Sequence, residues 1–108
     1  MIEILHNKQN TEKTEFIAYD NGEVLGRCAG SLCDGIFVFD ELDCDDFFVD
    51  GLVRAILNLM DLKGVMTARF ELPESDIERL KKLRFISDDS YVIPDIAEFF
   101  SGKCGGSN

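Results

Sequence analysis

Residues 36–72 read IFVFDELDC-DDFFVDGLVRAILNLMDLKG-VMTARFEL, which predicts a strand, a helix and a second strand in succession. Residues 36–44 are rich in Phe, Val and Ile, a composition typical of a central strand. Residues 46–62 switch to helical spacing. Five apolar residues share one face of this helix: Val49, Val53, Ile56, Leu57 and Met60. Gly64 provides the helix stop, and residues 65–72 return to a strand pattern.

The residues before this segment predict antiparallel strands. Within residues 14–30, two strand-like runs flank Asn21-Gly22, the pair preferred in two-residue type I′ hairpin turns. Residues 2–6 alternate well enough for a short strand, and a second break is expected at residues 31–35. An antiparallel meander therefore precedes the helix.

The residues after it predict a second helix and a last strand. Pro73 and Ser75 begin the helix, and Ser75 with Glu78 fits a capping box. Its apolar stripe consists of Ile77, Leu80 and Leu83. Residues 90–93 form the last strand, and residues 95–100 add a helical turn. The order β-β-β-β-α-β-α-β predicts an α+β fold with one mixed, mostly antiparallel sheet.

Length and composition limit the classes of function. The chain has 108 residues, 11 basic and 21 acidic, and a formal net charge of −10. We expect one domain over residues 1–100 and a flexible tail with Cys104 over residues 101–108. The negative charge argues against nucleic acid and anionic membranes as partners. No segment predicts a membrane span or a signal peptide, so we expect a cytoplasmic protein.

The four cysteines are Cys28, Cys33, Cys44 and Cys104. Free thiols are the default expectation in a reducing cytoplasm. A Cys28–Cys33 disulfide and a cysteine-rich zinc site are the two structural alternatives, although zinc usually recruits tightly spaced cysteine pairs. We therefore predict no metal site.

From Thr14 to Ile93 the chain resembles the GCN5-related N-acetyltransferase (GNAT) superfamily. EFIAYDNGEVLGRCAG resembles the second and third strands of the family, and FVFDELDC resembles its fourth strand. GLVRAILNLMDLKGV resembles its long helix, with Lys63-Gly64-Val65 as the usual ending. IERLKKLRFI resembles the later helix, and its Leu83-Arg84-Phe85 matches the family's Leu-Gly-Phe ending.

The resemblance implies an acyltransferase that moves an acetyl or other acyl group from acyl-CoA to an amine. Acetyl-CoA is the implied cofactor. Leu42, Asp43 and Cys44 would hold its pantetheine arm, and the loop aligned at residues 48–53 would hold its pyrophosphate. The implied pyrophosphate residues are Asp50, Gly51, Leu52 and Val53. The implied partners are a small amine or a basic peptide as acceptor, and a second copy of the chain in a homodimer.

The resemblance also suggests acid–base residues. Many family members use a tyrosine in the later helix to protonate the leaving thiolate, but Leu80 occupies the aligned position. Tyr91 is the nearest substitute in sequence. Glu41, or alternatively Glu71, could act as the general base.

The chain departs from the family in two places. Only residues 7–13 lie where a full-size member has two helices, so the acceptor wall is missing or is supplied by a second subunit. In the loop signature Q/R-x-x-G-x-G/A only Gly51 matches, since Phe48 and Val53 replace its first and last residues. Alternatively, Asp45 or Asp46 caps a helix that begins early and fills the loop position.

A second hypothesis follows from this degenerate loop. The chain would be a non-catalytic GNAT-like binding or dimerisation module that has lost CoA binding. The sheet or the apolar residues Phe47, Phe48, Phe99 and Phe100 would then contact a partner.

Overall fold

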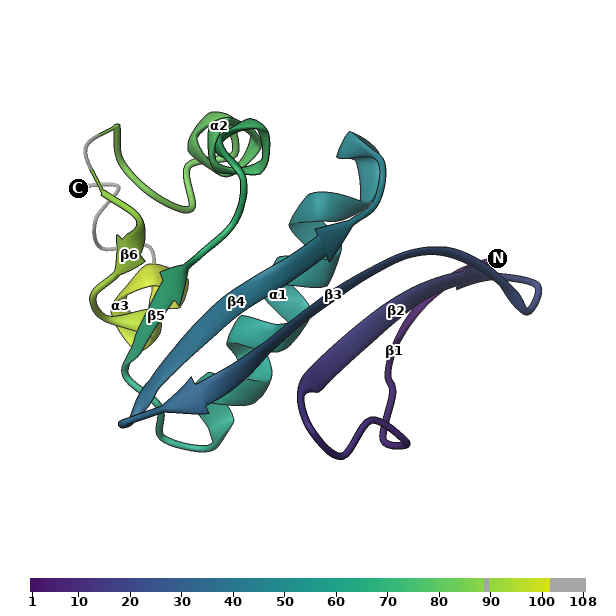
Figure 1. Cartoon of the computed structure of the whole chain (residues 1–108), viewed down its shortest axis with the longest axis horizontal. Helices are drawn as coiled ribbons and strands as arrows, with labels where there is room; N and C mark the ends of the chain where they lie inside the picture. Colours follow the sequence, from purple (N-terminus) through teal and green to yellow (C-terminus); the bar gives the residue numbers. More distant parts are fainter. Residues whose placement is uncertain (89, 102–108) are drawn as a thin grey trace.

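The computed structural model describes residues 1–88 and 90–101. These residues form a six-stranded sheet and three helices (Figure 1). The elements in chain order are β1 (Ile2–His6), β2 (Thr14–Asp20), β3 (Glu23–Cys33), β4 (Ile36–Asp43), α1 (Asp46–Leu62), β5 (Thr67–Phe70), α2 (Glu74–Lys82), β6 (Val92–Ile93) and α3 (Ile96–Ser101). The predicted α+β class and the order of elements are confirmed. From residue 102 on, the predicted tail and Cys104 lie outside the described residues.

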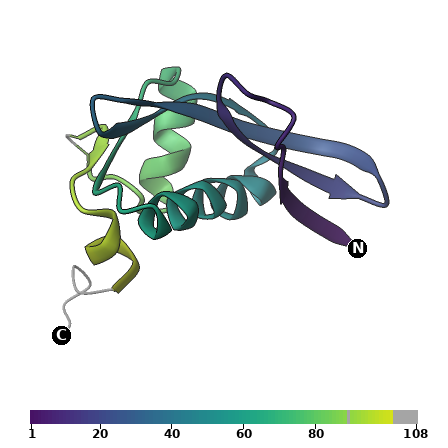
Figure 2. The same ribbon diagram turned by 90° about the horizontal axis from the view of Figure 1, so that it is seen from below.

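The strands lie in the sheet in the order in which they occur along the chain, β1 to β6. Only β4 and β5 are parallel, and α1 connects them. Every other neighbouring pair is antiparallel. Figure 2 shows α1 along one face of the sheet.

The two hairpin turns have the same backbone conformation. Asn21 and Gly22 have φ values of 52° and 87°, the left-handed conformation that a type I′ turn requires. Asp34 and Gly35 repeat it with 53° and 81°. The predicted break over residues 31–35 is therefore too wide, because β3 continues to Cys33 and only an Asp-Gly pair forms the turn.

A bulge at Asp40 changes the course of β4. Gly30 of β3 pairs with Phe39, but the adjacent Ala29 pairs with Glu41, so Asp40 is the extra residue. Phe39 is also the last residue of β4 that pairs with β5. Beyond the bulge, β4 continues to Asp43 paired only with β3, while the chain that follows β5 leaves toward α2.

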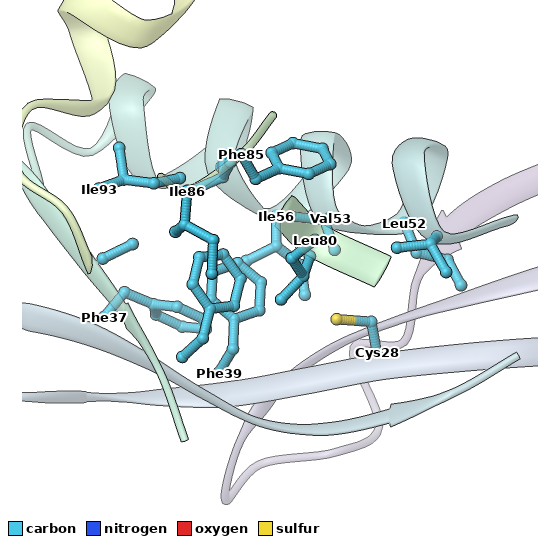
Figure 3. Packing of buried hydrophobic residues seen from close by; sticks show 14 of the residues in the cluster. Cys28, Phe37, Phe39, Leu52, Val53, Ile56, Leu80, Phe85, Ile86 and Ile93 are labelled. Carbon is cyan, nitrogen blue, oxygen red and sulfur yellow. The ribbon is translucent and has the colours of Figure 1, made fainter. Parts of the chain in front are cut away.

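The core lies between the sheet and the helices. Figure 3 shows Phe37, Phe39 and Cys28 pointing from the strands toward α1. The rings of Phe39 and Phe70 stack with centroids 4.6 Å apart. The buried residues of α1 are Val49, Leu52, Val53, Ile56, Leu57 and Met60. All five residues of the predicted helical face are therefore buried.

The ends of α2 differ from the prediction. The helix begins at Glu74, directly after Pro73, and no side-chain hydrogen bond caps it. The predicted capping box is wrong because Ser75 already lies inside the first turn. Arg84 has a φ of 66° just after the helix, so it adopts the left-handed conformation that the glycine of the family's Leu-Gly-Phe ending would favour.

The described cysteines are free. Cys28 is buried in the core and Cys33 is exposed at the end of β3, so a disulfide between them is excluded. Within residues 1–88 and 90–101, no group of three or more His, Cys, Asp or Glu side chains could hold a metal ion. No helix in the same ranges is long and apolar enough to cross a membrane.

Candidate functional site

An open groove of about 540 Å³ lies where β4 ends and α1 begins. The strand ends at Asp43, and only Cys44 and Asp45 separate it from the helix. The first turn of α2 forms the other side of the groove. The lining residues are Cys44, Asp45, Asp46, Phe47, Ser75 and Arg79.

Arg79 of α2 bridges this groove. Its Nη1 donates a hydrogen bond to Asp76 Oδ1 at 2.8 Å, and its Nη2 donates to the carbonyl oxygen of Cys44. Its Nε lies 2.8 Å from Asp46 Oδ1, in a geometry that makes an ion pair without a regular hydrogen bond. We call Arg79, Asp76, Asp46 and the Cys44 carbonyl the Arg79 clasp. It joins α2 to the end of β4 and to the first turn of α1.

The clasp holds a charged guanidinium. Burial alone lowers the pKa of Arg79, but the hydrogen bond to Asp76 and the charge of Asp46 raise it further than burial lowers it. The side chain is 23% exposed, so water screens these interactions only in part. The guanidinium therefore stays protonated and paired at neutral pH.

The segment aligned with the family's phosphate loop is helical. Because α1 begins at Asp46, Asp50, Gly51, Leu52 and Val53 lie in its second turn, where backbone N–H groups bond within the helix. This supports the interpretation of an early helix. Asp45 occupies the N-cap position but makes no side-chain capping bond.

The side chains of these four residues point in different directions. Leu52 and Val53 are fully buried in the core, and Asp50 pairs with Arg54 at 3.0 Å. A Cβ at Gly51 would lie 2.6 Å from Ile4 Cδ1 of β1. Gly51 thus allows α1 to approach β1 closely.

The residues predicted to hold the pantetheine arm lie near the groove, but only one of them lines it. Leu42 packs against the core, whereas Asp43 is exposed. Cys44 lines the groove and is partly buried. Burial raises the pKa of the Cys44 thiol, and the neighbouring Arg79 offsets this rise only in part. The thiol is therefore protonated near neutral pH.

The two acid–base candidates do not meet in the groove. Glu41 lies on the face of the sheet turned away from α1 and pairs with Lys13 and Arg27. Hydrogen bonds from these two cations lower the pKa of Glu41, which makes it a weak base. The Tyr91 hydroxyl lies 3.5 Å from Glu74 Oε1, and neither Tyr91 nor Glu41 lines the groove.

Sequence reasoning missed Arg79. The only local signal was its spacing of three residues from Asp76 in a predicted helix, which is common in solvent-exposed pairs. Its contact with Cys44 spans 35 positions along the chain. The contact forms because the fold brings α2 against the end of β4, and no local pattern in the sequence displays that arrangement.

Comparisons with known proteins identify the fold. No family model matches the chain, and no curated protein matches its sequence. Among solved structures, a probable acetyltransferase from Staphylococcus epidermidis superposes with a TM-score of 0.60, at 10% identity over 72% of this chain and 55% of its own. The PaiA N-acetyltransferase from Thermoplasma acidophilum, in complex with coenzyme A, gives 0.58, at 10% identity over 79% and 61%. The chain has a GNAT-like fold.

A third match extends the comparison. The ribosomal-protein-S18-alanine N-acetyltransferase from Escherichia coli gives a TM-score of 0.57 at 12% identity, over 81% of this chain and 72% of its own. At identities this low, the superpositions support the GNAT-like fold but say nothing about the substrate. The chain also spans little more than half of the Staphylococcus protein. In this chain, residues 7–13 form a loop between β1 and β2, where the resemblance implies two helices.

Proposed function

We propose that this protein is a GNAT-like binding module and that the Arg79 clasp takes the place of a coenzyme site. The observation that carries the proposal is that residues 50–53, where the resemblance places the pyrophosphate, belong to the second turn of α1, and that Arg79 bridges the adjacent groove. A loop of free N–H groups could cradle a pyrophosphate, but the second turn of a helix has none to offer.

The charges around the groove support the same proposal. Asp45 and Asp46 line the groove, against the single guanidinium of Arg79 among its lining residues. Asp43 lies in the adjacent pocket, beside Arg27. Asp46 and Asp76 already share the Arg79 guanidinium. Each like-charge contact near a surface costs on the order of 1 kcal/mol, whereas a helix N-terminus contributes about 0.3–2 kcal/mol to binding an anion. The residues present therefore do not fit a pyrophosphate.

The second candidate is an acyltransferase that moves an acyl group from acetyl-CoA to a small amine or a basic peptide. One observation favours it: β4 continues past the end of β5, which leaves part of its edge open beside the groove. A structural neighbour was also solved with coenzyme A. This candidate requires the Arg79 clasp to open.

Calorimetric titration of acetyl-CoA and free CoA at low salt tests the proposal. We expect no saturable heat at about 1 mM ligand, which means binding weaker than about −4 kcal/mol. Arg79→Met removes the guanidinium and keeps much of the side-chain volume. Arg69→Met is the matched control, because Arg69 pairs with Glu71 on the surface and does not line the groove.

The outcomes separate the two candidates. Micromolar binding by the unmodified protein that is lost in Arg79→Met would overturn the proposal and make Arg79 a phosphate ligand. The proposal is supported if the unmodified protein, Arg79→Met and Arg69→Met all fail to bind acetyl-CoA and CoA. It is also supported if only Arg79→Met gains binding. Thermal melting by circular dichroism confirms that each variant folds. Acetylation of a polyamine or a basic peptide, followed by mass spectrometry, would independently establish the acyltransferase.

A further inference from the structure

The outer edge of β1 carries unpaired backbone groups. Asn7 N donates to Glu15 O at 2.8 Å and continues the antiparallel pairing of β1 with β2. Hydrogen-bonded and non-hydrogen-bonded pairs alternate along such a ladder. The N–H and C=O groups of Ile2, Ile4 and His6 therefore point outward. Within residues 1–88 and 90–101, no backbone hydrogen bond outside the strand ladders reaches them.

The edge of β1 lacks the features that usually keep edge strands apart. Natural edges carry proline, lysine, bulges or very short strands. The sequence of β1 is IEILH, in which Glu3 is the only residue among Asp, Glu, Lys and Arg, and its pairing with β2 is regular. Ile2 is 46% exposed and Leu5 is 49% exposed. At the opposite edge, β6 has only two residues and offers far less to pair with.

We infer that β1 pairs antiparallel with β1 of a second copy of this chain, which joins the two sheets across a two-fold axis. The outward residues are symmetric about Ile4. Ile4 would pair with the partner's Ile4, and Ile2 would pair with the partner's His6. Each outward N–H then meets an outward C=O, because these three residues form the hydrogen-bonded positions of the new ladder.

The side chains fit the same register. On the face turned away from α1, Glu3 lies opposite the partner's Leu5, so the two Glu3 carboxylates are not directly paired. On the α1 face, Ile2 and Ile4 bring apolar surface to the axis, and the His6 ring is held by stacking on Phe16 with centroids 4.9 Å apart.

This inference names the partner of the proposed binding module, and its functional significance rests on the proposed function. The pairing itself depends only on β1. Two chains that each carry a charge of −10 repel one another, so we expect salt to tighten the dimer. A basic partner peptide on the same edge would show the opposite salt dependence.

Sedimentation velocity across a concentration series, at about 50 mM and about 500 mM NaCl, tests the dimer. Leu5→Lys places an ammonium group opposite the partner's Glu3, whereas Leu5→Glu places a second carboxylate there. Each contact occurs twice across the axis, so the Kd values of these two variants should differ by about tenfold or more. Val24→Lys and Val24→Glu are the matched controls, since Val24 is 57% exposed on β3, away from the β1 edge.

Ile2→Pro provides a test that is independent of charge. Proline removes an outward N–H and leaves the bonds of β1 to β2 in place, so the variant should be a folded monomer. Hydrogen exchange should show that the Ile4 and His6 amides of the unmodified protein gain protection as the concentration rises. The inference would be overturned if the protein stayed monomeric at about 1 mM in high salt. It would also be overturned if the Lys and Glu variants differed in Kd by the same factor at Val24 as at Leu5. Binding of CoA would overturn only the proposed function.

Discussion

The two faces of the sheet differ in how they are stabilised. The face under α1 is apolar and packs Phe37, Phe39 and Cys28 against the helix. The opposite face carries an ionic network in which Arg27 pairs with Glu15 and Glu41. The first face follows a periodic pattern that a sequence displays directly, whereas the second depends on which strands become neighbours.

The largest expected effect is on the apolar face. Phe39 is fully buried between Phe37 and Phe70. Phe39→Ala should lower the free energy of unfolding by about 3–5 kcal/mol, because it removes apolar contact and leaves a cavity. Urea denaturation measures the loss. Phe47→Ala is the control at an exposed position and should change stability by no more than about 0.5 kcal/mol. A loss below about 1 kcal/mol at Phe39 would contradict this account of the core.

The same difference explains what the sequence could predict. The bounds 46–62 of α1 were predicted correctly, because helical spacing is a local property and Gly64 marks the stop. Glu41 was placed correctly on β4, but its partner Lys13 lies 28 positions away and changes its chemistry. The groove depends on the bulge at Asp40 and on the reach of Arg79. Both are consequences of strand pairing, so a single sequence does not display them.

The second prediction concerns the ionic network. The Glu15 side chain is only 7% exposed, and Asn7 and Asn10 also donate hydrogen bonds to it. Arg27→Met leaves this carboxylate with neutral partners alone and should cost about 1–3 kcal/mol of unfolding free energy. Arg69→Met is the control, because Arg69 and Glu71 are both about half exposed and should contribute no more than about 1 kcal/mol. Equal losses of unfolding free energy in the two variants would mean that the burial of Glu15 does not strengthen its ion pair with Arg27.

The third prediction is a pH dependence that belongs to one face only. Burial raises the pKa of Glu15, but hydrogen bonds from Asn7, Arg27 and Asn10 lower it further, so its folded value lies below 4.5. A carboxyl group with a lowered pKa stabilises the fold above its unfolded pKa and loses that contribution as pH falls through the folded value. Stability measured by urea denaturation should therefore fall below about pH 4.5 more steeply than in Glu15→Gln. Parallel curves for the two proteins would assign the acid sensitivity to other carboxylates.

The smallest expected effect is at the rim of the apolar face, where α1 meets β1. Alanine at Gly51 gains about 0.5–1 kcal/mol in helix propensity but brings its Cβ to 2.6 Å from Ile4 Cδ1. That atom ends a side chain that can rotate, so the net change in unfolding free energy should stay within about 1 kcal/mol. Gly30→Ala is the contrast, because its Cβ would lie 2.2 Å from the carbonyl oxygen of Val38, and a strand cannot move aside as a methyl group can. A near-neutral Gly51→Ala, with CoA titrations unchanged from the unmodified protein, would identify Gly51 as a packing residue of α1. A folded Gly51→Ala variant with altered CoA affinity would instead support the pyrophosphate-binding role that the family resemblance implies for Gly51.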